Sequence, residues 1–81
     1  MPYIDPRSRS FVIEHGARTS GELNFAITRL LIRYTREQSL TTGYGAINDC
    51  LGALEGAKLE YYRRVAVPYE THKILENGDV Y

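Results

Sequence analysis

The chain has 81 residues, with ten basic and ten acidic side chains that leave no net charge at pH 7. This balance excludes a general nucleic-acid binder, which carries a basic excess. A single cysteine, Cys50, excludes an internal disulfide, and Cys50, His15 and His72 lack the spacing of zinc ligands. We therefore expect one small domain over residues 1–81 with no metal or cofactor. So short a chain commonly gains stability by forming a homo-oligomer.

Residues 1–18 are predicted to form an extended arm that is able to dock on a neighbour. Pro2 and Pro6 keep the first residues out of a helix, and Gly16 interrupts the short apolar group at residues 11–13. The segment lacks the apolar centre of a signal peptide, and no run of 18 apolar residues follows it. We therefore expect a cytoplasmic protein that does not enter a membrane.

A first helix is predicted over residues 19–38, with Ser20–Glu37 as its helical part. Thr19 and Glu22 have the spacing of a capping box. Phe25 and Ile32 extend the apolar surface beyond one face, so the helix needs more than one partner. Its main apolar face comprises Leu23, Ala26, Ile27, Leu30 and Tyr34, and its solvent side carries Arg29, Arg33 and Arg36.

A second helix is predicted over residues 43–67, with Gly45–Val65 as its central part. Pro68 ends it, because the residue before a proline avoids helical angles. Residues 39–45 connect the two helices, and Thr41 or Thr42 is expected to cap the second one. An apolar seam with coiled-coil spacing, interrupted by one lysine, consists of Ile47, Leu51, Leu54, Lys58, Tyr61 and Val65.

Two glycines, Gly52 and Gly56, lie one turn apart beside this seam. Each costs a helix about 1 kcal/mol relative to alanine. Small residues four apart let two helix backbones approach closely, which predicts a tight crossing within or between subunits. Alternatively, the glycines make room for Phe25 or Tyr34. The predicted oligomer interface comprises Leu51, Gly52, Leu54, Gly56, Tyr61, Phe25 and Ile32.

Residues 68–81 are predicted to form an extended tail. Asn77-Gly78 is a strong two-residue hairpin signal between short apolar arms at residues 74–75 and 80–81. Arms of this length are not stable alone, so the hairpin would lie on the helices or on another chain. The alternative is a frayed end.

Aromatic and cationic side chains gather near the end of the predicted second helix. Tyrosine rings stack on bases and guanidinium groups clamp phosphates, so this cluster suits a nucleotide. A structural interpretation stays open, because Glu60 and Arg64 form an ordinary helical ion pair and cations suit a helix C-terminus. The candidate ligand-binding residues are Lys58, Tyr62, Arg63, Arg64 and Tyr69.

Catalytic motifs are absent from the sequence, so no catalytic residue is assigned and no enzyme is expected. Residues 20–27, SGELNFAI, are faintly similar to the first helix of MazG-type pyrophosphatases, which hold magnesium with paired acidic residues one turn apart. Glu22 has no acidic partner at that spacing, and Glu60 is followed by Arg63 and Arg64. A MazG-like pyrophosphatase therefore ranks as the last alternative.

Five short blocks span nearly the whole chain: MPYI at residues 1–4, GELN at 21–24, AKLEYYRRV at 57–65, PYE at 68–70 and ENGDVY at 76–81. In these blocks the chain resembles a family of short phage-encoded hypothetical proteins with no established activity. The resemblance implies expression in a bacterial cytosol. By analogy with small helical phage proteins that counter host defence, we expect a non-enzymatic protein that sequesters a small anionic ligand, such as a nucleotide messenger, at a subunit interface. The alternative is an interaction or assembly module, binding itself or a host protein, with no small ligand.

Overall fold

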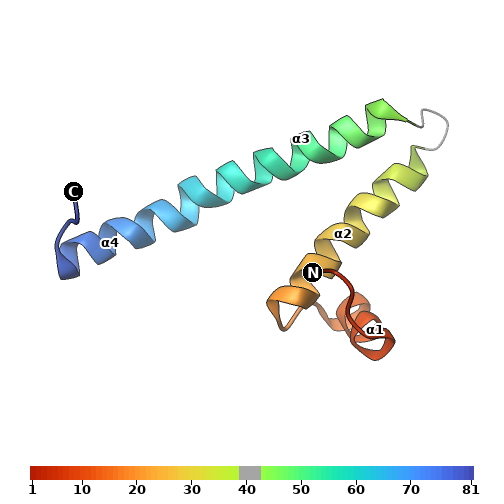
Figure 1. Ribbon diagram of the computed structural model, residues 1–81, viewed down its shortest axis with the longest axis horizontal. Coiled ribbons are helices and arrows are strands. Elements are labelled where there is room, and N and C mark those ends of the chain that lie inside the picture. Colours follow the sequence, from red (N-terminus) through yellow and green to blue (C-terminus); the bar gives the residue numbers. More distant parts are fainter. Residues whose placement is uncertain (39–42) are drawn as a thin grey trace. The chain divides into compact units, whose positions relative to one another are not determined.

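The computed structural model describes residues 1–38 and 43–81, and all regular structure in these ranges is helical. The order is α1 (Pro6–His15), α2 (Ser20–Glu37), α3 (Tyr44–Tyr61), the π-helical segment η2 (Tyr62–Ala66) and α4 (Val67–Asn77) (Figure 1). The all-α class is confirmed. Because α3, η2 and α4 follow one another without a break, the described residues contain three helices rather than the predicted two.

The chain divides into two compact units, Met1–Cys50 and Leu51–Tyr81. The first unit, the N-terminal unit, contains α1, α2 and the start of α3. The second, the C-terminal unit, contains the rest of α3 with η2 and α4. The predicted caps Thr41 and Thr42 lie outside the described residues.

The prediction of an extended arm over residues 1–18 is wrong for its central part, which forms α1. Asp5 caps the helix by accepting hydrogen bonds from the Ser8 backbone N–H at 2.9 Å and the Ser8 hydroxyl at 3.1 Å. Pro6 occupies the first turn, where its missing N–H costs nothing. Gly16 ends the helix with a positive φ of 92°. Pro6, which was predicted to keep this segment out of a helix, instead lies in the first turn of one.

Helix α2 spans the residues that were predicted to form a helix from Ser20 to Glu37. The Thr19 side chain accepts a hydrogen bond from the Glu22 backbone N–H at 3.1 Å, as the capping box requires. The Glu22 carboxylate turns elsewhere: it accepts hydrogen bonds from the Arg18 backbone N–H at 2.9 Å and from the Arg18 guanidinium at 3.0 and 3.1 Å.

Arg18, Glu22 and Phe11 together hold α1 against the start of α2. The Arg18 guanidinium carbon lies 3.6 Å from the centre of the Phe11 ring, a close cation–π contact. Glu22 is 6% exposed, and the hydrogen bonds from Arg18 lower the pKa of its carboxyl. Val12, 5% exposed, is the buried residue of α1. Figure 1 shows α1 beside the N-terminal end of α2.

Within the same unit, the start of α3 contacts the end of α2. The Tyr34 hydroxyl donates to the Asp49 carboxylate at 2.8 Å, and this hydrogen bond raises the pKa of Tyr34. The Cys50 thiol lies 3.6 Å from the Thr35 hydroxyl and 3.7 Å from the Leu31 carbonyl oxygen. Ala46 and Cys50 are buried, so Cys50 acts as a small core residue.

In the C-terminal unit, the prediction that the helix ends before Pro68 is wrong. A proline inside a helix lacks an N–H donor and clashes with the carbonyl four residues earlier, here that of Arg64. The π-helical segment η2 widens the turn ahead of Pro68, and the Val67 N–H bonds to the carbonyl of Tyr62, five residues back. Pro68 thereby lies in the first turn of α4, a position that proline tolerates.

The predicted hairpin at the end of the chain is also wrong, because residues 67–77 form α4. Asn77 is the last residue of that helix, and Gly78 caps it with a φ of 86° while its N–H bonds to the Ile74 carbonyl at 2.8 Å. A glycine after asparagine serves a helix C-terminus as well as a hairpin turn. Beyond it, Val80 and Tyr81 are fully exposed. No helix in the described ranges combines the length and apolar character needed to cross a bilayer.

Candidate functional site

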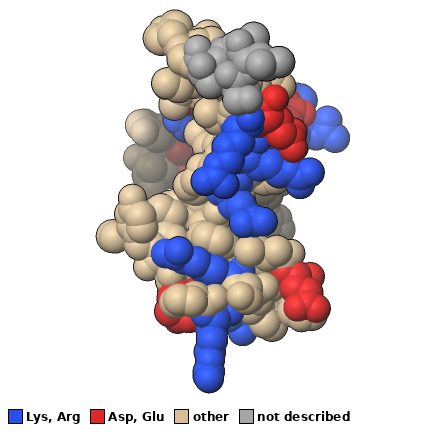
Figure 2. Space-filling view, turned by 90° about the vertical axis from the view of Figure 1, so that its right-hand side faces the viewer, with Lys and Arg blue, Asp and Glu red and all other residues tan. Residues whose placement is uncertain are grey.

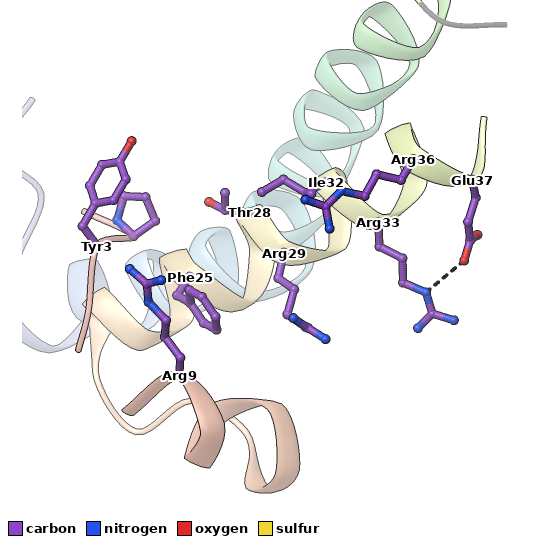
Figure 3. A pocket seen from close by; sticks show the side chains of 10 residues that line it. Tyr3, Arg9, Phe25, Thr28, Arg29, Ile32, Arg33, Arg36 and Glu37 are labelled. Atoms are coloured by element: carbon purple, nitrogen blue, oxygen red, sulfur yellow. Dashed lines mark hydrogen bonds and ion pairs between the residues drawn. The ribbon is translucent and has the colours of Figure 1, made fainter. Parts of the chain in front are cut away.

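A pocket of about 560 Å³ lies in the N-terminal unit, along one side of α2. Its volume falls in the range of small-molecule binding sites. Helical spacing of three and four brings one row of α2 side chains to the same side, where they form the floor of the pocket (Figure 3). These residues are Phe25, Thr28, Arg29, Ile32, Arg33, Arg36 and Glu37.

The chain before α1 forms the wall of the pocket, through Pro2 and Tyr3. Arg9, from α1, holds this segment in place because its Nε donates to the Ile4 carbonyl at 2.8 Å. The same guanidinium lies 5.8 Å from the centre of the Phe25 ring. In Figure 3, Tyr3, Arg9 and Phe25 lie together at one end, and the remaining arginines follow along α2.

Four arginines and one glutamate line the pocket, a net charge of +3. Arg33 pairs with Glu37, with Nε and Oε1 separated by 3.0 Å, so its charge is compensated locally. Within residues 1–38 and 43–81, neither Arg29 nor Arg36 has an ion pair or a hydrogen bond from its side chain. Figure 2 shows basic side chains gathered on the visible face, beside a smaller acidic group. The pocket therefore presents three guanidinium groups without a carboxylate partner, and two of them, Arg29 and Arg36, have no side-chain hydrogen bond among the described residues.

The aromatic end of the pocket differs from its cationic end. Phe25 is half-buried, whereas Tyr3 is 78% exposed and presents most of its ring to solvent. Ile32, half-exposed, continues the apolar surface along α2. A flat apolar group is accommodated beside Phe25 and Tyr3, while phosphates or carboxylates suit the arginines. The described lining thus combines aromatic surface with guanidinium groups, an arrangement suited to binding and orienting an anionic ligand.

The ligand-binding residues predicted from the sequence lie in the C-terminal unit, and the structure gives them different surroundings. Arg63 pairs with Glu60 at 2.9 Å, and Lys58 lies 3.8 Å from Glu55. Tyr62 and Tyr69 are more than half exposed, and Lys73 lies 5.7 Å from the centre of the Tyr69 ring. Arg64 has no side-chain partner among the described residues. Most of these cations are thus engaged with neighbours on their own helix.

The predicted oligomer interface falls into two groups. Phe25 and Ile32 line the pocket of the N-terminal unit. The others, in the C-terminal unit, are exposed: Leu51, Gly52, Leu54, Gly56 and Tyr61. Apart from its chain neighbours and its own helix backbone, a Cβ atom added at Gly52 or Gly56 would meet no described atom within 4 Å. A tight helix crossing, within or between subunits, and the alternative in which the glycines make room for Phe25 or Tyr34 both stay predictions.

The pocket residues that sequence analysis missed are Tyr3, Arg9 and the arginines of α2. The signal for the latter is present, because Arg29, Arg33 and Arg36 recur at spacings of four and three. This spacing by itself places the three arginines on a solvent-exposed side of the helix. The predicted extended arm at residues 1–18 gave no reason to expect other residues beside them. Among the described residues, no three histidine, cysteine or acidic side chains come together as a metal site.

The fold and the pocket define a small all-helical protein with an arginine-lined cavity. Over residues 1–80 the chain matches the model of DUF6899, described as a domain of unknown function, and it belongs to that family. No curated protein and no solved structure matches the chain.

Proposed function

We propose that this is a non-enzymatic binding protein that holds a small anionic ligand, such as a nucleotide, in the α2 pocket. The observation that carries the proposal is the pair Arg29 and Arg36, which line a cavity of about 560 Å³ with no partner among the described residues. Hydrogen bonds between a guanidinium and a phosphate are about twice as strong as neutral ones. Phe25 and Tyr3 supply the aromatic surface that a base requires.

The biological setting follows from the resemblance to short phage-encoded proteins. A phage accessory factor made in the bacterial cytosol counters host defence by sequestering a nucleotide messenger, and it needs affinity but no catalysis. The proposed site differs from the cluster around Arg63, because the N-terminal unit supplies every residue of the pocket. Binding at this site therefore does not require a subunit interface.

Thermal melts against a panel of cyclic and linear nucleotides test the proposal. A ligand present at about 100 times its dissociation constant stabilises the folded state by about 2.7 kcal/mol, which raises the melting temperature by several degrees. The double variant Arg29→Gln/Arg36→Gln should lose this shift, and the control Arg7→Gln, an exposed arginine of α1, should keep it. If Arg64→Gln lost the shift in melting temperature while the double variant kept it, the ligand would bind at the cluster around Arg63 instead. No shift with any nucleotide would remove the proposal.

A second candidate function, self-assembly, is favoured by the exposed apolar side chains of the C-terminal unit. No residue of Leu51–Tyr81 is buried. The large exposed side chains offer an area on the order of 800 Å², which is what each partner of a stable interface buries. Those within the helical part up to Ile74 are Leu51, Leu54, Leu59, Tyr61, Tyr62, Val65, Val67, Tyr69 and Ile74. We propose that a second copy of this chain covers them and that Gly52 and Gly56 lie at the crossing.

Light scattering at micromolar concentration tests this assembly. Gly56→Leu should stabilise the helix if Gly56 faces solvent, and it should dissociate the copies if Gly56 lies at their crossing. On a free helix, the leucine meets open space and only improves helix propensity, by about 1 kcal/mol. At a tight crossing the leucine would separate the copies, and the assembly should dissociate. A monomeric parent, or a Gly56→Leu variant that assembles as the parent does, would contradict the proposal.

The pyrophosphatase alternative gains no support from the site. Glu22, the acidic residue on which it depended, is buried and bonded to Arg18. Its carboxylate accepts hydrogen bonds from Arg18, which stacks on Phe11 of α1, and Glu37 is the acidic residue among the described pocket lining. We therefore propose binding without hydrolysis.

A further inference from the structure

The pocket residues are arranged along the axis of α2, from an aromatic end to a cationic end. Phe25 comes first, Arg29 follows one turn later, and Arg36 two turns after that. At a rise of 1.5 Å per residue, the backbone positions of Phe25 and Arg36 are about 16 Å apart along the helix. Figure 3 shows Arg29, Arg33 and Arg36 leaving successive parts of the helix. The site is therefore elongated and has a direction.

The charges are distributed along this axis rather than concentrated at one point. Arg29 leaves α2 one turn after Phe25, and Arg36 leaves it two turns later with its side chain turned back toward Ile32, while Arg33 is paired with Glu37 (Figure 3). A nucleoside monophosphate carries its single phosphate next to the sugar, within reach of Arg29 when the base lies on Phe25. Such a ligand leaves Arg36 without an anion. It also brings at most two negative charges to a pocket whose net charge is +3.

The aromatic end has the features of a base platform. Arg9 lies over one part of the Phe25 ring at 5.8 Å and is itself fixed by the Ile4 carbonyl. Tyr3 lies across from it on the N-terminal segment, with most of its ring exposed. A base stacked here adds an aromatic contact and a guanidinium contact, each of which is tolerant of base identity.

We propose that the ligand is an extended nucleoside polyphosphate, whose base stacks at Phe25 and Tyr3 and whose phosphate chain runs along α2 toward Arg36. This inference rests on the proposed function and assigns a direction to that same site. Arg29 contacts the phosphate nearest the sugar, and Arg36 contacts the terminal phosphate. Arg33 is already paired with Glu37, so Arg29 and Arg36 are the arginines of α2 left for the phosphates.

Calorimetric titration with AMP, ADP and ATP tests this direction in the intact protein. Because a charged hydrogen bond between an arginine and a phosphate is worth about tenfold in affinity, ATP should bind about tenfold or more tighter than AMP. Arg29→Gln should weaken all three nucleotides by a similar factor. Arg36→Gln should weaken ATP about tenfold and leave AMP within about twofold. Arg7→Gln serves as the matched control, and circular dichroism confirms that each variant is folded.

Inorganic triphosphate provides the complementary probe, because it carries the phosphate chain without a base. It should bind more weakly than ATP, and Phe25→Leu should weaken ATP while leaving inorganic triphosphate unchanged. Inorganic triphosphate that binds as tightly as ATP would overturn the base contact.

Equal affinities for AMP, ADP and ATP, or equal effects of Arg36→Gln on all three, would overturn the direction while the proposed function stands. Failure of every nucleotide to bind would remove both.

Discussion

The two units of the chain differ in whether they bury side chains. In Met1–Cys50, α1 and α2 each begin at a side-chain cap, and Val12, Glu22, Ala46 and Cys50 are buried. In Leu51–Tyr81 the helix continues through η2 and α4, yet every residue is exposed except the half-buried Ala66. The first unit therefore has a small core, and the second is a helix without one.

This difference shows where each helix gains its stability. Isolated helices in water are marginal, and most helical stability in proteins comes from packing an apolar face. The N-terminal unit buries Val12, Ala46 and Cys50 internally, where α1 contacts α2 and where Tyr34 of α2 bonds to Asp49 of α3. The C-terminal unit has the apolar side chains but no internal surface to cover them, and a second copy is our proposed source. Four changes test this contrast.

The largest effect is expected from Leu54→Glu in the C-terminal unit. Leu54 is the least exposed of the leucines there, and a carboxylate in an apolar contact between copies would cost more than about 3 kcal/mol. Light scattering should show monomers, and the helical circular dichroism of the segment should fall at micromolar concentration. The control Glu55→Gln removes only an exposed pair with Lys58 and should change neither. An unaffected Leu54→Glu variant would mean that this side of the helix faces water.

The next effect, of opposite sign, is expected from Pro68→Ala. Alanine restores the N–H donor and removes the ring that displaces the Arg64 carbonyl, so η2 should close into regular α-helix. The gain in intrinsic propensity should be smaller than the ~3 kcal/mol that proline costs in a helix interior, because Pro68 already lies in the first turn of α4. Hydrogen exchange of residues 62–72 should slow relative to the parent. Faster exchange would mean that the π-helical turn makes a stabilising contact of its own.

A smaller loss of stability is expected from Val12→Ala in the N-terminal unit. Val12 is 5% exposed, and removal of two buried carbon atoms should cost about 1–2 kcal/mol in unfolding free energy. Its neighbour Ile13 is 52% exposed, so Ile13→Ala should change stability by less than about 0.5 kcal/mol. Urea denaturation of both variants checks the difference. Equal losses would indicate that α1 packs on α2 through a different face.

The smallest effect is a pH dependence that comes from Glu22. Hydrogen bonds from Arg18 lower the pKa of Glu22 below its ordinary value of 4.5, so the ionised carboxylate stabilises the folded state above that pH. This stabilisation should be lost as the pH falls through the lowered pKa. Thermal melts between pH 7 and pH 3 should show the parent losing its advantage over Glu22→Gln. A constant difference between the two proteins would show that the charge of Glu22 contributes nothing.

Local signals predict α2 well, because its capping residues and apolar spacing act within the helix itself. Thr19 caps the helix as expected, and Ser20–Glu37 is helical. Three other signals are ambiguous in physical terms. Pro6 and Pro68 both fit the first turn of a helix, and Gly78 fits a helix end as well as a hairpin. Local sequence alone does not choose between these uses.

The pocket is not predictable from local patterns, because its wall and floor come from segments that sequence spacing does not connect. The spacing of Arg29, Arg33 and Arg36 places them on one side of the helix, but nothing in it shows that Tyr3 and Arg9 lie beside them. The hydrogen bond from Arg9 to the Ile4 carbonyl, which holds the wall in place, depends on α1, a helix that the nearby prolines argue against.

The position of Pro2 and Tyr3 in the pocket wall has a practical consequence for anyone handling this molecule. An affinity tag fused ahead of Met1 would emerge directly beside the cavity, where its own carboxylates or histidines compete for Arg29 and Arg36. A tag after Tyr81 instead follows the other unit, which supplies no residue of the pocket. Binding measured with the two tag placements should therefore differ, and the cleaved protein should match the C-terminal fusion.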